Sequence, residues 1–221
     1  MINAVHAMLW DLDGTIVETK TNHFLTWQRA MEKYGFHLEK SLYDANFGRN
    51  NATLLPIFLG FDPDPELKEE IIQYKEALFR ELIPDGITLV PGVESWLAAA
   101  SAMRIPQAIA SSGPIMNIYQ MLSSTNLERY FIEVVSGSEL PAKPDPDIFL
   151  QAAARLDVLP GNCLVVEDSI AGVQAAHRAG MHCIAVTTSH TRDELSLADV
   201  IIDDFKAAFD QVLKTIGSVE S

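Results

Sequence analysis

Apolar residues gather in short continuous runs, one at the start of the chain and the others in its second half. Within each run the apolar positions are adjacent rather than alternating, which is typical of strands covered on both faces. Five runs are clear and a sixth is weaker: 4–10, 107–112, 132–136, 163–168, 182–188 and, weakly, 199–203. Segments with helical periodicity lie between them, at 93–103, 116–125, 147–157 and 171–180. Strand followed by helix, repeated, predicts an open α/β fold with a parallel sheet.

One region breaks this alternation. Between residues 18 and 83 there is no strand pattern, only helical segments at 23–35, 51–60 and 64–83. Asp64 can cap the last of these helices, whose Lys- and Glu-rich surface we expect to face solvent. The sequence therefore predicts an all-helical domain inserted after the first strand, with an α/β core of residues 1–16 and 87–221 and a cap of residues 17–86.

Composition excludes several classes of partner. The formal net charge of −14, from 30 acidic and 16 basic residues, disfavours nucleic acid and anionic membrane surfaces. No apolar stretch reaches the roughly 18 residues needed to span a membrane, and the N-terminus lacks the basic segment of a signal peptide. Cys163 and Cys183 both lie in apolar runs, so we expect two buried thiols rather than a disulfide. We expect a cytoplasmic protein, a monomer or weak homodimer.

The residues that leave the predicted strands carry the candidate chemistry. In open α/β sheets, ligands bind beyond the carboxyl ends of the strands. Taken singly, each polar segment there has an ordinary explanation as a turn, a helix cap or a solvated loop. Together they deliver carboxylates, a hydroxyl and an ammonium group to one edge: Asp11, Asp13, Ser111, Lys143, Glu167 and Asp168.

Clustered carboxylates need a counter-charge, because two like charges about 4 Å apart repel by roughly 4 kcal/mol at an effective dielectric near 20. An oxygen-only set of ligands suits Mg²⁺. A phosphoryl group would bind the Mg²⁺ through its oxygens, with Lys143 offsetting its charge and Ser111 donating a hydrogen bond. An aspartate can itself be a nucleophile and form an aspartyl-phosphate, so we predict that Asp11 attacks while Asp13 moves protons.

Four motifs carry a family resemblance. They are "DLDGT" at residues 11–15, Ser111 in "IASSG", Lys143 in "KPDPDIF", and "VVEDSIAGVQAAHRAG" at 165–180. In these four motifs the chain resembles the haloacid dehalogenase superfamily, in the branch with a helical cap inserted after the first motif. The resemblance implies a Rossmann-like, doubly wound parallel sheet and phosphoryl chemistry, since the dehalogenating members lack an acid at the place of Asp13.

The same resemblance implies roles for the motif residues. Asp11 is the expected nucleophile and a Mg²⁺ ligand, and Asp13 is the acid and base, lending its main-chain carbonyl to the metal. Asp168 completes the metal shell, with Glu167 as a ligand or an outer partner. Ser111 and Lys143 hold the phosphoryl group, with Ser112 beside them. Gly14 allows the chain to turn into the cap.

Within the cap, "NHFLTWQRAMEKYG" resembles β-phosphoglucomutase, which carries a histidine and a tryptophan at the spacing of His23 and Trp27. His23 either gates access to Asp13 or is a solvated helix residue, and Trp27 either contacts substrate or packs in the cap core. Mutases bind the distal phosphate with an arginine three residues beyond a cap glycine. Asn51 occupies that place here, with Arg49 directly after the glycine.

Two further positions differ from the mutase: Pro114 replaces a lysine, and the first motif ends in Thr15, as in most phosphatases. We therefore predict a Mg²⁺-dependent phosphatase of a small phosphate ester, foremost a sugar phosphate. Trp27, Arg49, Asn50 and Asn51 are the candidates for substrate choice.

Three alternatives remain open. The first is β-phosphoglucomutase, which uses the same nucleophile. The second is a phosphonate-cleaving member, which needs a cap lysine for a Schiff base; Lys20, Lys33 and Lys40 are available but are predicted to be surface charges. The third is a phospho-accepting receiver module, although such domains are about half this length and lack a cap.

Overall fold

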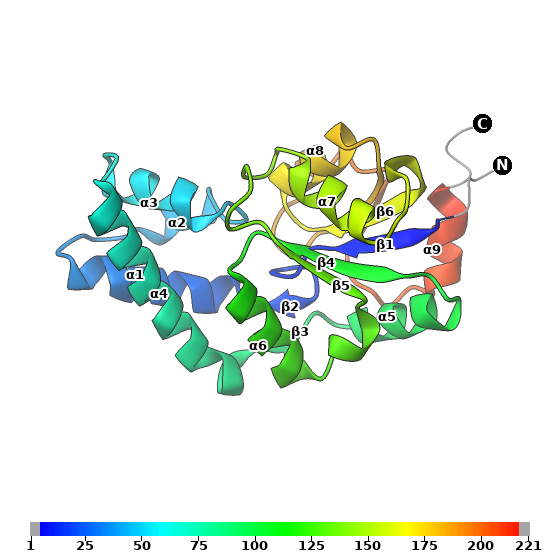
Figure 1. Ribbon diagram of the computed structural model, residues 1–221, viewed down its shortest axis with the longest axis horizontal. Coiled ribbons are helices and arrows are strands. Elements are labelled where there is room, and N and C mark those ends of the chain that lie inside the picture. Colours follow the sequence, from blue (N-terminus) through cyan, green and yellow to red (C-terminus); the bar gives the residue numbers. More distant parts are fainter. Residues whose placement is uncertain (1–4, 217–221) are drawn as a thin grey trace.

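The computed structural model describes residues 5–216, apart from the side chains of residues 84 and 85. Its centre is a parallel sheet of six strands in the order β5-β4-β1-β6-β7-β8 (Figure 1). The strands are β1 (Ala7–Trp10), β4 (Gln107–Ser111), β5 (Glu133–Ser136), β6 (Cys163–Glu167), β7 (His182–Val186) and β8 (Val200–Ile202). Each matches a predicted run to within three residues at either end, except that residue 4 lies outside the described part. The predicted fold class is confirmed.

Helices cover both faces of the sheet, which is why the strands are apolar throughout. In β1, Met8 and Trp10 enter the core on one face, and Ala7 and Leu9 enter the core on the other. The first face is covered by α5 (Val93–Ala102), α6 (Ile115–Thr125) and α9 (Phe209–Ile216), and the second by α7 (Asp147–Arg155) and α8 (Ile170–Arg178). Short 3-10 turns occupy Glu128–Tyr130 and Pro160–Asn162.

Four helices follow the first strand and form one end of the molecule (Figure 1). They are α1 (Lys20–Lys33), α2 (Lys40–Asp44), α3 (Asn51–Leu59) and α4 (Pro65–Gly86). They bury a hydrophobic core of their own around Trp27, Leu55 and Ile71. As expected, Asp64 caps α4, accepting hydrogen bonds from two backbone N–H groups of its first turn. We propose that these helices form a cap over an α/β core.

The two connections between cap and core pair with each other. Strand β2 (Val17–Glu18) lies antiparallel to β3 (Thr88–Leu89), with Val17 opposite Leu89. The sequence showed no strand here, because two-residue strands leave no periodic pattern. The predicted cap of residues 17–86 thus begins with a strand rather than a helix, and we propose that this ribbon is the hinge of the cap.

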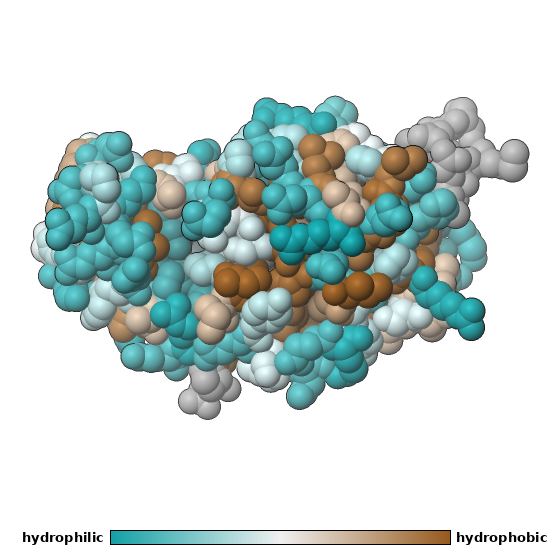
Figure 2. Space-filling model, viewed as in Figure 1, coloured by the Kyte–Doolittle hydropathy of each residue, from teal (hydrophilic) through white to brown (hydrophobic). Residues whose placement is uncertain are grey.

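On the face seen in Figure 2, the surface of the cap is largely hydrophilic. Among the described helices, none combines the length and the apolar composition needed to cross a bilayer. Cys163 and Cys183 are buried free thiols, as predicted, with burial raising the pKa of each.

Candidate active site

An acidic cluster lies at the carboxyl edge of the sheet. Strands β1 and β6 are paired neighbours, with Trp10 opposite Val166, so the residues that follow them meet. Carboxylate oxygens of Asp11, Glu167 and Asp168 lie within 4.8 Å of one another, and all three side chains are buried. The structure therefore brings together the acidic residues that the sequence placed at two separate strand ends.

Lys143 is the cation within this cluster. Its ammonium group donates to Asp11 Oδ1 and Glu167 Oε1, each at 2.7 Å, and to the Ala110 carbonyl at 3.3 Å. Burial alone would lower the pKa of Lys143, but the two carboxylates outweigh it and raise the pKa above its ordinary value. The alternative that Lys143 is merely solvated is wrong, since only 5% of the residue is exposed.

One ammonium group does not balance three carboxylates. Burial raises the pKa of Asp11 well above its ordinary value, although Lys143 opposes the shift. Burial, with the charge of Glu167, raises the pKa of Asp168 to about 7 against hydrogen bonds from Ser189 and Thr15. A buried set of hard oxygen donors short of positive charge fits a divalent cation such as Mg²⁺.

Glu167 is held by the surrounding structure more completely than the other two acids. Its Oε2 accepts hydrogen bonds from the backbone N–H groups of Asp168 at 2.7 Å and Ser169 at 2.6 Å, while its Oε1 accepts from Lys143. Asp11 and Asp168 line the pocket between the helical cap and the core, whereas Glu167 does not. Of the two roles left open by the sequence, this setting favours an outer partner that positions Lys143, and Asp11 and Asp168 are the acids that could ligate a metal.

Gly172 provides the space for Glu167. A Cβ atom added at this glycine would lie 1.7 Å from Glu167 Oε1, so no other residue fits without moving the carboxylate. The sequence motif contained this glycine, but no role was predicted for it.

Gly172→Ala should therefore destabilise the protein by about 1–2 kcal/mol, because a Cβ at 1.7 Å places the overpacking cost in the upper part of the usual 1–3 kcal/mol and a gain of about 1 kcal/mol in helix propensity offsets part of it. Urea unfolding measures this. Gly161→Ala is the matched control, because the nearest atom to its added Cβ is 4.0 Å away. Equal stability of the two variants would contradict the packing argument.

Gly14 lies behind the cluster in a backbone conformation with φ of +88°, which favours glycine. A Cβ atom here would lie 2.1 Å from Asp168 Oδ2. Gly14 thus turns the chain, as the resemblance implied, and also leaves room for the carboxylate. Thr15 Oγ1 donates to Asp168 Oδ1 at 3.2 Å, and Ser189 Oγ donates to the other oxygen. The sequence gave no signal for Ser189.

Asp13 turns away from the cluster and toward the cap. Its Oδ1 accepts from Thr19 Oγ1 at 2.6 Å and lies 3.0 Å from His23 Nε2, and its Oδ2 accepts from Ser111 Oγ at 3.3 Å. Burial would raise the pKa of Asp13, but hydrogen bonds from His23 and Thr19 outweigh it and lower the pKa. In this arrangement Asp13 is a carboxylate.

His23 joins Asp13 to a buried lysine. Its Nδ1 lies 2.9 Å from the ammonium group of Lys75, which can only donate, so Nε2 carries the proton given to Asp13. The imidazole stacks on Phe79, with centroids 3.9 Å apart and planes 1° from parallel. The alternative of a solvated helix histidine is wrong. The structure instead places His23 where it orients Asp13.

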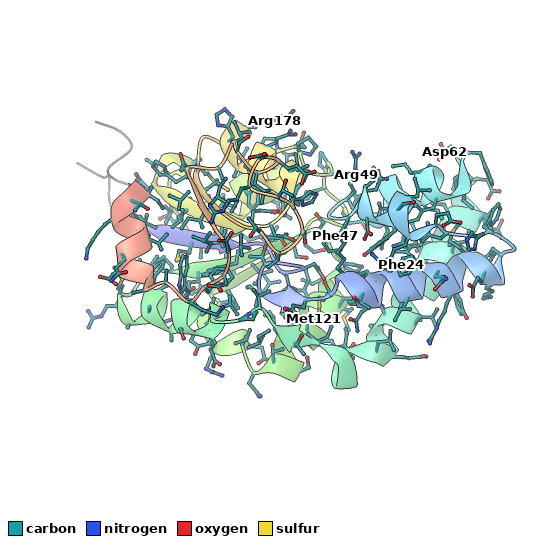
Figure 3. The ribbon with its side chains drawn as sticks, turned by 180° about the vertical axis from the view of Figure 1, so that it is seen from behind. Phe24, Phe47, Arg49, Asp62, Met121 and Arg178 are labelled. Atoms are coloured by element: carbon teal, nitrogen blue, oxygen red, sulfur yellow. The ribbon has the colours of Figure 1, made fainter. Side chains whose placement is uncertain are left out.

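A pocket separates the cap from the core above these residues. Phe47 and Arg49 lie where the cap faces the core (Figure 3). The pocket is lined from the core by Asp11, Asp13, Ser112, Gly113, Pro114, Asp168 and Ser169, and from the cap by His23, Trp27, Tyr43, Phe47, Gly48, Arg49, Asn50, Asn51, Leu54, Lys75 and Glu76. Gly14, Ser111, Lys143 and Glu167 are not part of its lining.

The predicted substrate-choice residues have different settings in this pocket. Trp27 is 1% exposed and packs edge-on against Phe58, so both of its proposed roles are compatible with its place. Asn50 caps α3 by accepting from the Thr53 N–H group at 3.0 Å. Asn51 donates to Glu76 Oε1 at 2.6 Å, and Arg49 is exposed at the rim.

Lys75 and Glu76 are the main residues that sequence reasoning missed. The Lys- and Glu-rich surface of α4 was expected to face solvent, but these two residues are only 1% and 4% exposed. A signal was present, because Lys75 lies one helical turn from Ile71 and from Phe79, both buried. The surface interpretation was correct for Lys33 and Lys40, which are exposed, while Lys20 is half-buried and pairs with Asp44 at 3.4 Å; none of the three lines the pocket.

Residues 8–186 match the haloacid dehalogenase-like hydrolases, and the chain belongs to this family of enzymes. This confirms the resemblance seen in the motifs and sets aside the receiver-module alternative. The chain is 32% identical over 185 residues to a phosphorylated carbohydrates phosphatase of Thermotoga maritima, covering 81% of this chain and 84% of that protein.

A second relative is a mutase. The chain is 32% identical over 190 residues to β-phosphoglucomutase of Bacillus subtilis, covering 81% of this chain and 82% of that protein. The structure of a β-phosphoglucomutase from Clostridium difficile superposes with a TM-score of 0.88 at 23% identity, covering 98% of this chain and 99% of that one. At this identity the structural likeness concerns the fold.

Proposed function

We propose that this protein is a Mg²⁺-dependent phosphatase that hydrolyses a small phosphorylated carbohydrate through an aspartyl-phosphate. The observation that carries the proposal is that Asp11 and Asp13 line the core side of a pocket whose other side is formed by the cap. Lys143 donates a hydrogen bond to Asp11 from within the core. A relative that is a phosphatase of phosphorylated carbohydrates supports this choice of substrate.

The first step is attack by a carboxylate oxygen of Asp11 on phosphorus, which breaks the bond from phosphorus to the leaving oxygen. Mg²⁺, held by Asp11, Asp168 and the Asp13 carbonyl, would supply positive charge for the phosphoryl oxygens. Lys143 holds Asp11 in place and offsets negative charge from the opposite side. Ser112 and the Gly113 backbone lie in the pocket as donors to the same group.

Asp13 serves both halves of the reaction. A phosphoryl dianion placed beside it raises the pKa of this carboxyl, because like charge disfavours the ionised form. Asp13 then takes up a proton from solvent and gives it to the leaving oxygen. In the second half the Asp13 carboxylate takes a proton from the water that attacks the aspartyl-phosphate, and the bond from phosphorus to the Asp11 oxygen breaks to release phosphate. Thr19 and His23 hold its carboxylate toward the pocket through both steps.

The proposal is tested by measuring phosphate release from sugar phosphates, polyol phosphates, nucleotides and phosphoglycolate. We expect release from hexose or pentose monophosphates, loss of activity with EDTA and recovery with added Mg²⁺. Failure to release phosphate from any ester in the presence of Mg²⁺ would overturn the proposal.

Asp168→Ala should raise the Mg²⁺ concentration needed for half-maximal activity by about ten-fold or more, since loss of even an outer partner costs 10–100-fold in metal affinity. Titrating Mg²⁺ against rate measures this, and Mn²⁺ binding followed by electron paramagnetic resonance gives a readout independent of turnover. An activation curve like that of the wild type would remove Asp168 from the metal site.

β-Phosphoglucomutase activity is the second candidate. The 32% identity to the Bacillus subtilis mutase and the position of His23 against Asp13 favour it. Interconversion of β-glucose 1-phosphate and glucose 6-phosphate that depends on a bisphosphate would support the mutase. Release of free phosphate from the monophosphate supports the hydrolase.

A further inference from the structure

A buried carboxylate, Glu76, lies on the cap side of the pocket. Its Oε1 accepts from Asn51 Nδ2 at 2.6 Å and from the Lys75 ammonium group at 2.7 Å, and its Oε2 accepts from Asn117 Nδ2. Burial would raise the pKa of Glu76, but the charge of Lys75 and the hydrogen bonds from Lys75 and Asn51 lower it. The group is therefore an ion, surrounded by donors.

The carboxylate joins the two sides of the pocket. Asn51 and Lys75 belong to the cap, while Asn117 comes from α6 of the core and is 1% exposed. Arg80 Nη1 donates to Asn117 Oδ1 at 3.2 Å, which leaves the amide nitrogen of Asn117 to face Glu76. Lys75 and Asn117 are thus fixed as donors to Glu76, and Asn51 adds a third hydrogen bond with the cap in this position.

The position of Glu76 changes the charge that a substrate meets. Lys75 lines the pocket and is the buried cation of the described part of the cap, so alone it would attract a second anionic group on the substrate. The Lys75 ammonium group and the Glu76 carboxylate lie 2.7 Å apart, so together they present almost no net charge to the pocket. Asn51 stands where mutases carry an arginine, and its amide group also donates a hydrogen bond to Glu76. Arg49 is exposed, so solvent screens its charge.

We propose that Glu76 determines substrate choice by neutralising Lys75, so that the pocket selects an uncharged, hydroxyl-bearing leaving group over one that carries a second phosphate. The inference rests on the proposed phosphatase function and narrows its substrate class to monophosphates. Asn51, Lys75 and Glu76 all line the pocket and can exchange hydrogen bonds with hydroxyl groups, whereas a second anionic group placed here would find no unopposed cation, since Glu76 offsets Lys75. Withholding a counter-charge from one ligand class in this way gives discrimination between ligands.

The test compares kcat/KM for fructose 6-phosphate and fructose 1,6-bisphosphate in the wild type, in Glu76→Gln and in Glu81→Gln. Glu81 lies exposed on the same helix and lines none of the pocket, so it controls for the loss of one charge from α4. We expect the wild type and the control to favour the monophosphate. Glu76→Gln should shift the ratio toward the bisphosphate by about ten-fold or more, because Lys75 then presents an unopposed positive charge to the second phosphate.

Each outcome bears on a stated claim. A ratio in Glu76→Gln equal to that of the control overturns this inference, while the phosphatase function stands on phosphate release by the wild type. A wild type that favours the bisphosphate overturns the inference even if Glu76→Gln fails to fold. If the wild type releases phosphate from no ester, the proposed function fails and the inference fails with it.

Discussion

Asp11→Asn is expected to lower phosphate release from every monoester by at least about three orders of magnitude, because an amide cannot replace the attacking carboxylate. The substitution keeps the shape of the side chain. It also removes one of three buried acids that lie within 4.8 Å of one another, so repulsion in the cluster falls. Lys143 retains its hydrogen bond to Glu167. We therefore expect the folded structure to survive while turnover does not.

Phosphate release with and without the substitution measures the first claim, and circular dichroism with thermal unfolding measures the second. Asp62→Asn is the matched control, because Asp62 is exposed on the cap and far from the pocket (Figure 3). The control should retain wild-type rates. A folded Asp11→Asn protein with activity within about ten-fold of the control would remove Asp11 from the nucleophile's role.

The sheet could be predicted because the burial of each strand shows in the sequence of that strand alone. A strand covered on both faces must be apolar at every position, and that signal survives in a single sequence. Helix α9 was missed although a signal was present, because Phe209, Val212 and Ile216 recur at helical spacing and form its buried face. The β2–β3 ribbon was missed because a two-residue strand has no period.

The floor of the pocket could be predicted for a related reason. Parallel strands deliver their carboxyl ends to one edge, so the order of polar residues after the strands already implies their meeting. What the sequence could not give was the partners that each aspartate meets. Asp11 faces Lys143, but Asp13, two residues on, faces the hinge and the cap through Thr19 and His23.

The cap side of the pocket was less predictable, because charged residues on a helix normally face solvent. Lys75 and Glu76 are exceptions that satisfy each other, at 2.7 Å, inside the interface between cap and core. Their burial depends on the packing of α4 against α6, which brings Asn117 to the same place. No property of the helix alone encodes that contact, so the residues that we propose to choose the substrate emerge only from the folded structure.

Asp13→Asn is expected to lower kcat/KM for glucose 6-phosphate by about 10²–10⁴-fold, the usual contribution of a general acid. The sugar alkoxide is a poor leaving group and needs the proton that Asp13 supplies. p-Nitrophenolate leaves without one, so kcat/KM for p-nitrophenyl phosphate should fall far less. The ratio of the two losses isolates the acid role, because misplacement of Asp11 would slow both substrates equally.

The second half of the reaction gives the variant a further signature. Without Asp13 as a base, water attacks the aspartyl-phosphate slowly, so p-nitrophenolate should appear in a rapid burst followed by a slow steady rate. The burst amplitude should approach one per active site, a result that requires a covalent intermediate. Equal losses on both substrates with no burst would contradict the assignment. Asp13 would then serve to hold His23 and Ser111, which its carboxylate also contacts, rather than to transfer protons.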